Sequence, residues 1–385
     1  MKMFPLRSQS LSIHQYNKCL LRKDTATATA AAVVATIIRR VTKFTKYENC
    51  SVITKNTDTN ATNSGVSSVS LNRYFPQRKQ QTPFAYPLTT FVSSNRAITT
   101  TMSNKSDDIN VRNYYNVALE LVMKCGPLVR EGYNKTNADY KQKSEFFDLV
   151  TKYDKQIEDI LIEGLQNAFP ESKFIGEEAA AESGKVPELT DAPTWIIDPI
   201  DGTTNFIHRI PHWCISVGLA INKELVVGIV YNPIANEMYS ASKGNGAYLN
   251  GQPIHVKKCN KMNDAVLAYE ISLIHAPAVR DKNVKRLSKL AANSTGTRCI
   301  GSGALTLCYV ARGSFDCYHV EDLQAWDIAG GAVILREAGG VLYHTKGGEF
   351  EIMKPNLIAA ATPELAKIMV GLIEEADALT DFTFK

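Results

Sequence analysis

Residues 195–206 have the sequence WIIDPIDGTTNF, and this stretch decides the organisation of the chain. The apolar, largely β-branched run Trp195–Ile197 is typical of a buried strand. Asp198 and Asp201 follow on either side of Pro199, which cannot donate to a β-ladder and favours extended backbone at the residue before it. We therefore expect the strand to end here, with two carboxylates at its end.

The residues after the two acids predict a tight turn into a helix. Gly202 permits a sharp change of backbone direction, and Thr203, Thr204 and Asn205 are suited to the N-cap of a helix. A strand end with two acids can hold a divalent metal ion, and the free N–H groups of a following helix can bind a phosphate. The alternative is a solvated acidic turn on the surface. The buried approach strand argues against that alternative, because it fixes the acids at the edge of a core.

Composition indicates a globular chain with an unusual N-terminal part. The 385 residues are 44% hydrophobic, which is enough for one large domain or two average ones. Residues 1–100 contain 14 Lys and Arg but three acids, whereas the remaining 285 residues contain 29 basic and 36 acidic residues. The excess of positive charge therefore lies in the N-terminal segment, and nothing predicts nucleic-acid binding by the globular part.

The sequence also gives no sign of a membrane span or a disulfide framework. Its longest candidate for a span, Ala30–Ile38, has nine residues, against about 18 for a spanning helix. The eight Cys form no CxxC pair, and several, such as Cys214 and Cys308, lie in apolar contexts. We expect buried free thiols in a reducing compartment.

Two segments are expected on this basis. Residues 1–105 are rich in Ser, Thr, Asn and basic residues and predict a disordered extension, whereas residues 106–385 predict the globular, catalytic part. A basic, acid-poor N-terminus is also typical of a mitochondrial transit peptide. A further alternative is that Met102 begins a shorter cytosolic product. We expect a cytoplasmic protein, with a mitochondrial location as the alternative.

Periodicity predicts a layered α/β architecture. Before the central stretch we expect a helix from Asp107 that Gly126-Pro127 interrupts or ends, a loop or hairpin over residues 128–144, a helix over Asp148–Leu165 and a strand over Lys173–Ile175. After it, residues 213–249 predict an antiparallel meander. Beyond that meander, strands alternate with helices to the end of the chain, which indicates layers of helices on sheets.

Four acids stand at the predicted junctions of these elements. Glu177 and Asp198 follow strands, Asp201 lies in the turn, and Asp327 lies in the first turn of a later helix. Carboxylates without His or Cys partners suit Mg²⁺ or Mn²⁺ and not zinc. Two metal ions about 3.5–4 Å apart need bridging carboxylates, and Glu177 and Asp198 are placed to serve. Asp154, near the start of a predicted helix, is by itself typical of an acid that complements the helix dipole.

Four motifs together resemble the inositol monophosphatase family of lithium-sensitive, magnesium-dependent phosphatases. They are WIIDPIDGTTNF itself, DLVTKYD at residues 148–154, GEE at 176–178 and WDIAGG at 326–331. The DPIDGTxN and WD motifs in this order are highly specific, whereas GEE alone is weak. The resemblance covers about residues 107–378 and implies a five-layer αβαβα sandwich of the inositol monophosphatase and fructose-1,6-bisphosphatase type.

The same resemblance implies an activity. It predicts a phosphoric monoester hydrolase that converts myo-inositol monophosphate to myo-inositol and phosphate, and so feeds inositol and phosphatidylinositol metabolism. It further implies a homodimer, inhibition by Li⁺, and two to three Mg²⁺ ions, with Mn²⁺ as a possible substitute. An alternative is a related phosphatase for another small sugar or nucleotide phosphate. A metal-binding pseudoenzyme, kept as a dimeric interaction protein, is a second alternative, although the acids and the Thr that the chemistry needs are all present.

Ligands for the metal ions are implied residue by residue. Glu177, Asp198 and the main-chain carbonyl of Ile200 would hold the first Mg²⁺. The second ion would lie between Asp198, Asp201 and Asp327. A third, weaker ion would lie beside Glu177, near the loop that contains Lys143.

Catalytic and substrate contacts are implied in the same way. Thr203 paired with Asp154 would activate the attacking water, with Glu177 as a third catalytic residue. The amides of Gly202 and Thr203 would bind phosphate. The complete set implied to contact substrate is Glu177, Ile200, Asp201, Gly202, Thr203, Gly301, Ser302, Gly303, Glu321 and Asp327.

One position departs from the family pattern. The family commonly has a Glu seven residues before the Asp of the WD motif, where it contacts an inositol hydroxyl. Here that position is Val320, and Glu321 is its neighbour. Either a one-residue shift lets Glu321 serve, or hydroxyl recognition differs, so the preferred alcohol is open. The short connection between the GEE and WIID motifs favours a small monophosphate over larger substrates of related phosphatases.

Overall fold

A computed structural model describes residues 105–135, 140–142, 149–271, 274 and 277–380. All of these residues belong to one compact unit. The predicted N-terminal extension and the loop that contains Lys143 lie outside the described residues. None of the described helices combines the length and the apolar character that a membrane-spanning helix requires.

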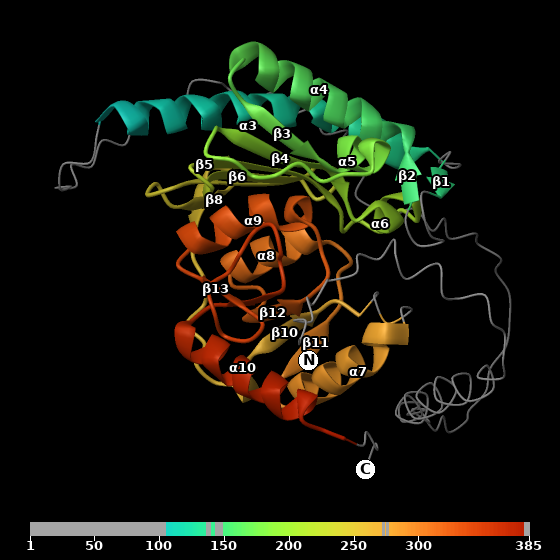
Figure 1. Cartoon of the computed structure of the whole chain (residues 1–385), viewed down its shortest axis with the longest axis vertical. Helices are drawn as coiled ribbons and strands as arrows, with labels where there is room; N and C mark the ends of the chain where they lie inside the picture. Colours follow the sequence, from blue (N-terminus) through green and yellow to red (C-terminus); the bar gives the residue numbers. More distant parts are fainter. Residues whose placement is uncertain (1–104, 136–139, 143–148, 272–273, 275–276, 381–385) are drawn as a thin grey trace, which may run out of the picture. The chain divides into compact units, whose positions relative to one another are not determined.

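Helices and sheets alternate in five layers (Figure 1). The first helical layer consists of α3 (Lys105–Asn134) and α4 (Lys152–Ala168), which cover one face of a seven-stranded sheet. The central layer consists of α8 (Gly303–Ala311) and α9 (Ala325–Glu337), between the two sheets. The last consists of α7 (Pro277–Ala292) and α10 (Pro363–Asp377), on the far face of a five-stranded sheet. The predicted αβαβα sandwich is confirmed.

The seven-stranded sheet has the order β3-β4-β5-β6-β7-β8-β9. Only its first pair, β3 with β4, is parallel, and the other pairs are antiparallel, as the predicted meander requires. Its strands are β3 (Lys173–Gly176), β4 (Thr194–Asp201), β5 (Cys214–Ile221), β6 (Glu224–Asn232), β7 (Glu237–Ser242), β8 (Ala247–Leu249) and β9 (Gln252–Ile254).

The five-stranded sheet has the order β11-β10-β12-β14-β13. Its strands are β10 (Val266–Tyr269), β11 (Gly296–Arg298), β12 (Cys317–Val320), β13 (Val341–His344) and β14 (Leu357–Ala360). Strands β10, β11 and β12 are mutually parallel, so their carboxyl ends meet at one edge of the sheet. The segments that follow these three strands therefore start side by side, and two of them lead into α8 and α9.

The predicted interruption at Gly126-Pro127 is wrong, because α3 continues through Pro127 to Asn134. At Gly126 a Cβ would lie 2.8 Å from the Tyr231 ring, so the helix packs closely on β6 at this point. Burial of Val122 and Val129 on either side of the Pro holds the helix against the sheet. Tertiary packing thus outweighs the local penalty of a Pro inside a helix.

The second predicted helix starts later than expected. Instead of beginning at Asp148, α4 begins at Lys152, after a short strand β2 (Leu149–Thr151) that pairs with β1 (Tyr140–Gln142). Thr151 is the N-cap: its hydroxyl accepts a hydrogen bond from the N–H of Tyr153, while the carboxylate of Asp154 accepts one from the N–H of Thr151. This capping box fixes Asp154 at the helix start.

Candidate active site

Strand β4 carries Asp198 and Asp201 through an irregularity that the sequence did not predict. The strand does not end at Pro199 but continues to Asp201, and its pairing with β5 shifts register between the two acids. Asp198 pairs with Ser216 and Asp201 with Cys214, so β4 has one residue more than β5 in this interval. In a regular strand, residues three apart point to opposite faces, and an extra residue removes that alternation. The bulge therefore lets both acids reach the same site.

Asp327 completes a cluster with these two acids. One carboxylate oxygen from each of Asp198, Asp201 and Asp327 lies within 4.8 Å of the others. Asp327 is the third residue of α9, and its carboxylate accepts a hydrogen bond of 2.6 Å from the N–H of Gln324 in a capping box. The helix thus brings a carboxylate to β4 from more than 120 residues along the chain, as the WD motif predicted.

The amino end of α8 holds Asp201 in place. Its carboxylate accepts hydrogen bonds from the hydroxyl of Ser302 at 2.5 Å and from the N–H groups of Ala304 at 2.8 Å and Gly303 at 3.2 Å. The predicted substrate segment Gly301–Gly303 is therefore beside the acid cluster. In this structure the Ser302 hydroxyl and the Gly303 amide serve to orient Asp201, a role that the sequence did not indicate.

Burial and mutual repulsion disfavour charge on the clustered acids. Burial, followed by the negative charges of Glu177, Asp201 and Asp327, raises the pKa of Asp198 well above its ordinary value. Burial also raises the pKa of Asp201 to about 6, although its hydrogen bonds from Ser302, Ala304 and Gly303 oppose that rise. Buried carboxylates this close together are typical of a site that binds a cation.

Glu177 stands beside this cluster as the first residue of the short helix α5 (Glu177–Ser183). Its charge is the second-largest cause of the raised pKa of Asp198 and also contributes to that of Asp154. The predicted ligand is therefore electrostatically coupled to both acids. The strand-to-helix junction at Gly176 places it there, as the sequence suggested.

The helix that follows β4 begins with a glycine N-cap. Gly202 has φ 94° and caps α6 (Thr203–Ile207) without a side-chain hydrogen bond, so the prediction of Thr203, Thr204 or Asn205 as the cap is wrong. A Cβ at Gly202 would lie 2.9 Å from the carbonyl oxygen of Gly301. Both the left-handed backbone and the close contact require glycine here.

The side chain of Asn205 connects this turn to the segment before α8 by hydrogen bonds. Its side-chain amide donates to the carbonyl oxygens of His212 at 2.6 Å and Ile300 at 2.8 Å. The DGTTN turn and the Gly301–Gly303 segment, almost 100 residues apart in sequence, are thereby joined. This role was missed, because nothing in the sequence specifies the partners of a buried amide.

Thr203 and Asp154 lie next to each other, as the family motifs implied. The hydroxyl of Thr203 donates to the carbonyl oxygen of Ile200 at 3.0 Å and lies 3.5 Å from Asp154 Oδ1. The other oxygen of Asp154 accepts from the hydroxyl of Thr151 at 2.5 Å and from its N–H at 2.9 Å. Burial raises the pKa of Asp154 to about 7, and the charges of Glu177 and Glu178 add to the rise. The hydrogen bonds from Thr151 oppose it.

Glu321 is engaged in an ion-pair network with α7. Its two carboxylate oxygens lie 2.6 Å from Lys282 Nζ and 2.8 Å from Arg286 Nη1. Burial acts to raise the pKa of Glu321, but Lys282 and Arg286 outweigh it and bring the pKa to about 2. Val320 is buried in the core. Glu321 begins the segment after β12, at the edge where the parallel strands end, and its contact with substrate stays a prediction.

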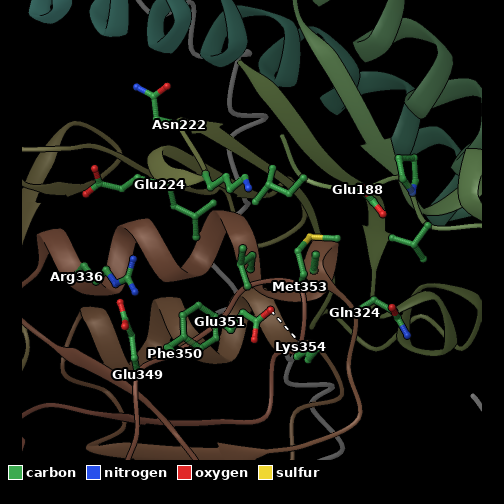
Figure 2. Close-up of a pocket in the computed structure, with 17 residues that line it drawn as sticks. Glu188, Asn222, Glu224, Gln324, Arg336, Glu349, Phe350, Glu351, Met353 and Lys354 are labelled. Atoms are coloured by element: carbon green, nitrogen blue, oxygen red, sulfur yellow. Dashed lines mark ion pairs between the residues drawn. The ribbon is translucent and has the colours of Figure 1, made fainter. Parts of the chain in front are cut away.

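A separate pocket of about 1280 Å³ lies on another part of the same unit (Figure 2). Its described lining contains none of the site residues predicted from the sequence, although Gln324 and Ala325 at the start of α9 reach it. Charges of both signs line it, including Glu188, Glu351 and Lys354, and Glu351 pairs with Lys354. The acid cluster, not this pocket, is therefore the candidate active site.

Residues 110–378 match the inositol monophosphatase family. The chain belongs to this family. Inositol monophosphatase 3 of Solanum lycopersicum is 42% identical over 267 residues, which cover 69% of this chain and 98% of the relative. Human inositol monophosphatase 2 is 38% identical over 263 residues, 68% of this chain and 90% of the relative. The solved structure of the extragenic suppressor protein SuhB of Bartonella henselae superposes with a TM-score of 0.61 at 31% identity, covering 68% of this chain and 98% of that one.

Membership of the inositol monophosphatase family confirms the resemblance that the motifs carried, together with the predicted enzyme class of phosphoric monoester hydrolase. The family is metal-dependent, and the three clustered aspartates are suited to bind a metal ion. The match begins within α3 and ends one residue after α10, so it spans nearly all of the described unit.

Proposed function

We propose that this chain is a Mg²⁺-dependent phosphatase that hydrolyses myo-inositol monophosphate to myo-inositol and phosphate. The observation that carries the proposal is the cluster of Asp198, Asp201 and Asp327, with the Thr203–Asp154 pair beside it. Relatives named inositol monophosphatase support the choice of substrate.

The acids fit a hard divalent cation. Three carboxylates contribute oxygens within 4.8 Å of one another, and burial raises the pKa values of Asp198 and Asp201, with the neighbouring carboxylates adding to the rise at Asp198. Oxygen donors without thiolate or imidazole favour Mg²⁺ or Mn²⁺. We assign one ion to Glu177, Asp198 and the Ile200 carbonyl, and a second to Asp198, Asp201 and Asp327. Mg²⁺ bound there would supply Lewis acidity towards the phosphoryl oxygens.

Thr203 and Asp154 would orient the attacking water and accept its proton. The hydroxyl of Thr203 lies within reach of both the Ile200 carbonyl and the Asp154 carboxylate, so it can donate to one while accepting from water. A carboxylate whose pKa is raised to about 7 is a suitable proton acceptor near neutral pH. The amides of Gly202 and Thr203, at an N-cap that makes no side-chain hydrogen bond, would bind the phosphate.

The alcohol part of the substrate would lie at the edge where β10, β11 and β12 end. Gly301–Gly303 follow β11, and Glu321 follows β12, so both reach this edge. We propose that Glu321, held by Lys282 and Arg286, contacts an alcohol hydroxyl in place of the buried Val320.

Further properties are proposed on family grounds. They are a homodimer, inhibition by Li⁺, two to three Mg²⁺ ions with Mn²⁺ as a substitute, and no nucleic-acid partner. The third ion is assigned beside Glu177. We propose a cytoplasmic location, with a mitochondrial one as the alternative that sequencing of the mature N-terminus from cells would decide.

Phosphate release from a substrate panel tests the function. The panel contains myo-inositol 1-phosphate, fructose 1,6-bisphosphate, adenosine 3′,5′-bisphosphate and an inositol polyphosphate, each with Mg²⁺, with EDTA, and with Mg²⁺ plus Li⁺. We expect the highest kcat/KM for the inositol monophosphate, and no turnover in EDTA. In Asp201→Asn, turnover should fall by orders of magnitude. Near-normal Mg²⁺-dependent turnover in that variant, or Mg²⁺ binding without any phosphate release, would overturn the proposal.

A further inference from the structure

A buried carboxylate outside the proposed chemistry lies against the start of α5, next to the proposed metal ligand Glu177. Glu158 on α4 is fully buried, at 0% exposure. Its two oxygens accept hydrogen bonds from the N–H groups of Glu178 at 2.9 Å and Ala179 at 2.8 Å. These are the second and third residues of α5, and the first is Glu177, the proposed metal ligand. Glu158 therefore binds the backbone immediately after that ligand through two hydrogen bonds.

Gly176 makes room for this contact. A Cβ at Gly176 would lie 2.6 Å from the carboxyl carbon of Glu158 and 2.6 Å from its Oε2. The φ of Gly176 is −110°, an extended conformation that any residue adopts, so space and not backbone conformation requires glycine. The glycine of the GEE motif thus serves the approach of the Glu158 carboxylate to α5.

Glu158 also belongs to the same helix face as a catalytic residue. Asp154 lies four residues earlier on α4, and residues four apart lie one above the other on a helix. Both are buried, and Asp154 approaches Thr203 while Glu158 approaches α5. One helix therefore contacts both Thr203 and the start of α5, where Glu177 lies.

We propose that Glu158 is a positioning residue for the metal site: by binding the amides of Glu178 and Ala179, it fixes the place of the Glu177 carboxylate and so sets the affinity for the divalent cation. This inference rests on the proposed function, in which Glu177 is a metal ligand. Residues that support metal ligands from behind commonly change metal affinity by about 10–100-fold when they are mutated.

A purely structural role predicts a different pattern. If Glu158 only capped α5, its loss would reduce thermal stability but leave Mg²⁺ affinity, KM and kcat of the folded protein unchanged. If Glu158 places Glu177, the loss appears as weaker Mg²⁺ binding that high Mg²⁺ concentrations overcome. The two roles are separated by a binding measurement on the folded protein.

The test uses Glu158→Gln and Gly176→Ala in the full chain. The first replaces one of the two acceptor oxygens by an NH₂ group at nearly constant shape. The second leaves Glu158 intact but displaces its carboxylate. Direct titration with Mg²⁺ by calorimetry should show about tenfold weaker binding in both. The Mg²⁺ concentration for half-maximal activity should rise in parallel. At saturating Mg²⁺, kcat should return to within about threefold of the original, and KM for the phosphate ester should change little.

Two further variants make the outcomes decisive. Glu163→Gln, an exposed position on the same helix, is the matched control and should bind Mg²⁺ as the unmodified protein does. Glu177→Gln should weaken binding more than Glu158→Gln. If Glu177→Gln weakens binding but folded Glu158→Gln and Gly176→Ala do not, the positioning role is wrong. If Glu177→Gln itself leaves Mg²⁺ binding unchanged, the ligand assignment in the proposed function fails instead. Should Glu158→Gln not fold, Gly176→Ala decides.

Discussion

Asp154→Asn should abolish catalysis while making the metal-free protein more stable. The carboxylate is buried and lies among the charges of Glu177 and Glu178, which raises its pKa from 3.8 to about 7. A neutral amide of the same shape removes that penalty. It also keeps the hydrogen bonds: its oxygen can accept from Thr151, and its NH₂ can donate to the Thr203 hydroxyl, whose own proton is directed to the Ile200 carbonyl.

The size and the sign of the effect follow from the pKa shift. Because the pKa in the folded protein lies above the unfolded value, the folded state binds the proton more tightly, and stability falls as pH rises from about 4 to about 7. A rise of about three units at 1.36 kcal/mol each amounts to about 4 kcal/mol above pH 7. Asp154→Asn should recover most of this free energy of unfolding at pH 8, little of it at pH 4, and an intermediate amount at pH 5.5.

Urea unfolding and thermal unfolding in EDTA at the three pH values measure this gain, and phosphate release with Mg²⁺ measures the loss of activity. In a unit of this size, 1 kcal/mol shifts the melting temperature by about 2–4 °C, so a rise of about 10 °C is expected at pH 8. Glu163→Gln, exposed on the same helix, should change neither quantity. The raised pKa of Asp154 is refuted as the cause if Asp154→Asn is no more stable than the unmodified protein at pH 8, or if its gain in stability is the same at pH 4.

Three other substitutions test residues that orient a site acid, pack the helix α9 against the sheet, or are proposed to contact the alcohol. Ser302→Ala removes the 2.5 Å hydrogen bond to Asp201 and should raise the Mg²⁺ concentration for half-maximal activity several-fold, with a smaller change in KM. Gly228→Ala would place a Cβ 2.3 Å from the Gly330 carbonyl oxygen and should lower the free energy of unfolding by about 1–3 kcal/mol, measured by urea unfolding. Glu321→Gln should raise KM for inositol monophosphate several-fold at constant kcat; an unchanged KM would exclude its contact with the alcohol.

Much of the fold could be predicted because local patterns agree with it. Beyond the meander, where alternating strands and helices were expected, β14 spans the apolar run Leu357–Ala360 and the last helix begins at Pro363, a residue suited to the first turn of a helix. The clustered acids could be predicted because each was expected at the end of a strand or at the start of a helix. The chemistry of the residues, not their spacing alone, then predicted a hard cation as the metal.

Failures occurred where tertiary contacts decide. Pro127 does not end α3, because burial on β6 holds the helix together. Pro199 does not end β4, because Pro199 lies in a bulge, where the strand continues although Pro has no N–H to donate to the ladder. Glu158 was missed although it lies four residues after Asp154 on a predicted amphipathic helix, a spacing that could have drawn attention to it. An acid on the buried face of an amphipathic helix does not contribute to an apolar core. Such a position therefore indicates a carboxylate with a specific polar partner.

The acids of the site come from both sides of the boundary between the first sheet and the central helices, and the glycines of that boundary explain how they meet. A Cβ at Gly218 on β5 would lie 2.6 Å from the Cβ of Ala329, and one at Gly330 would lie 2.9 Å from Ser216 Oγ. Helix α9 therefore contacts the sheet almost backbone to backbone. Asp327 is a short side chain, and only so close an approach lets it reach carboxylates on β4. The WDIAGG sequence thus supplies both the third carboxylate and the small residues that bring it within range.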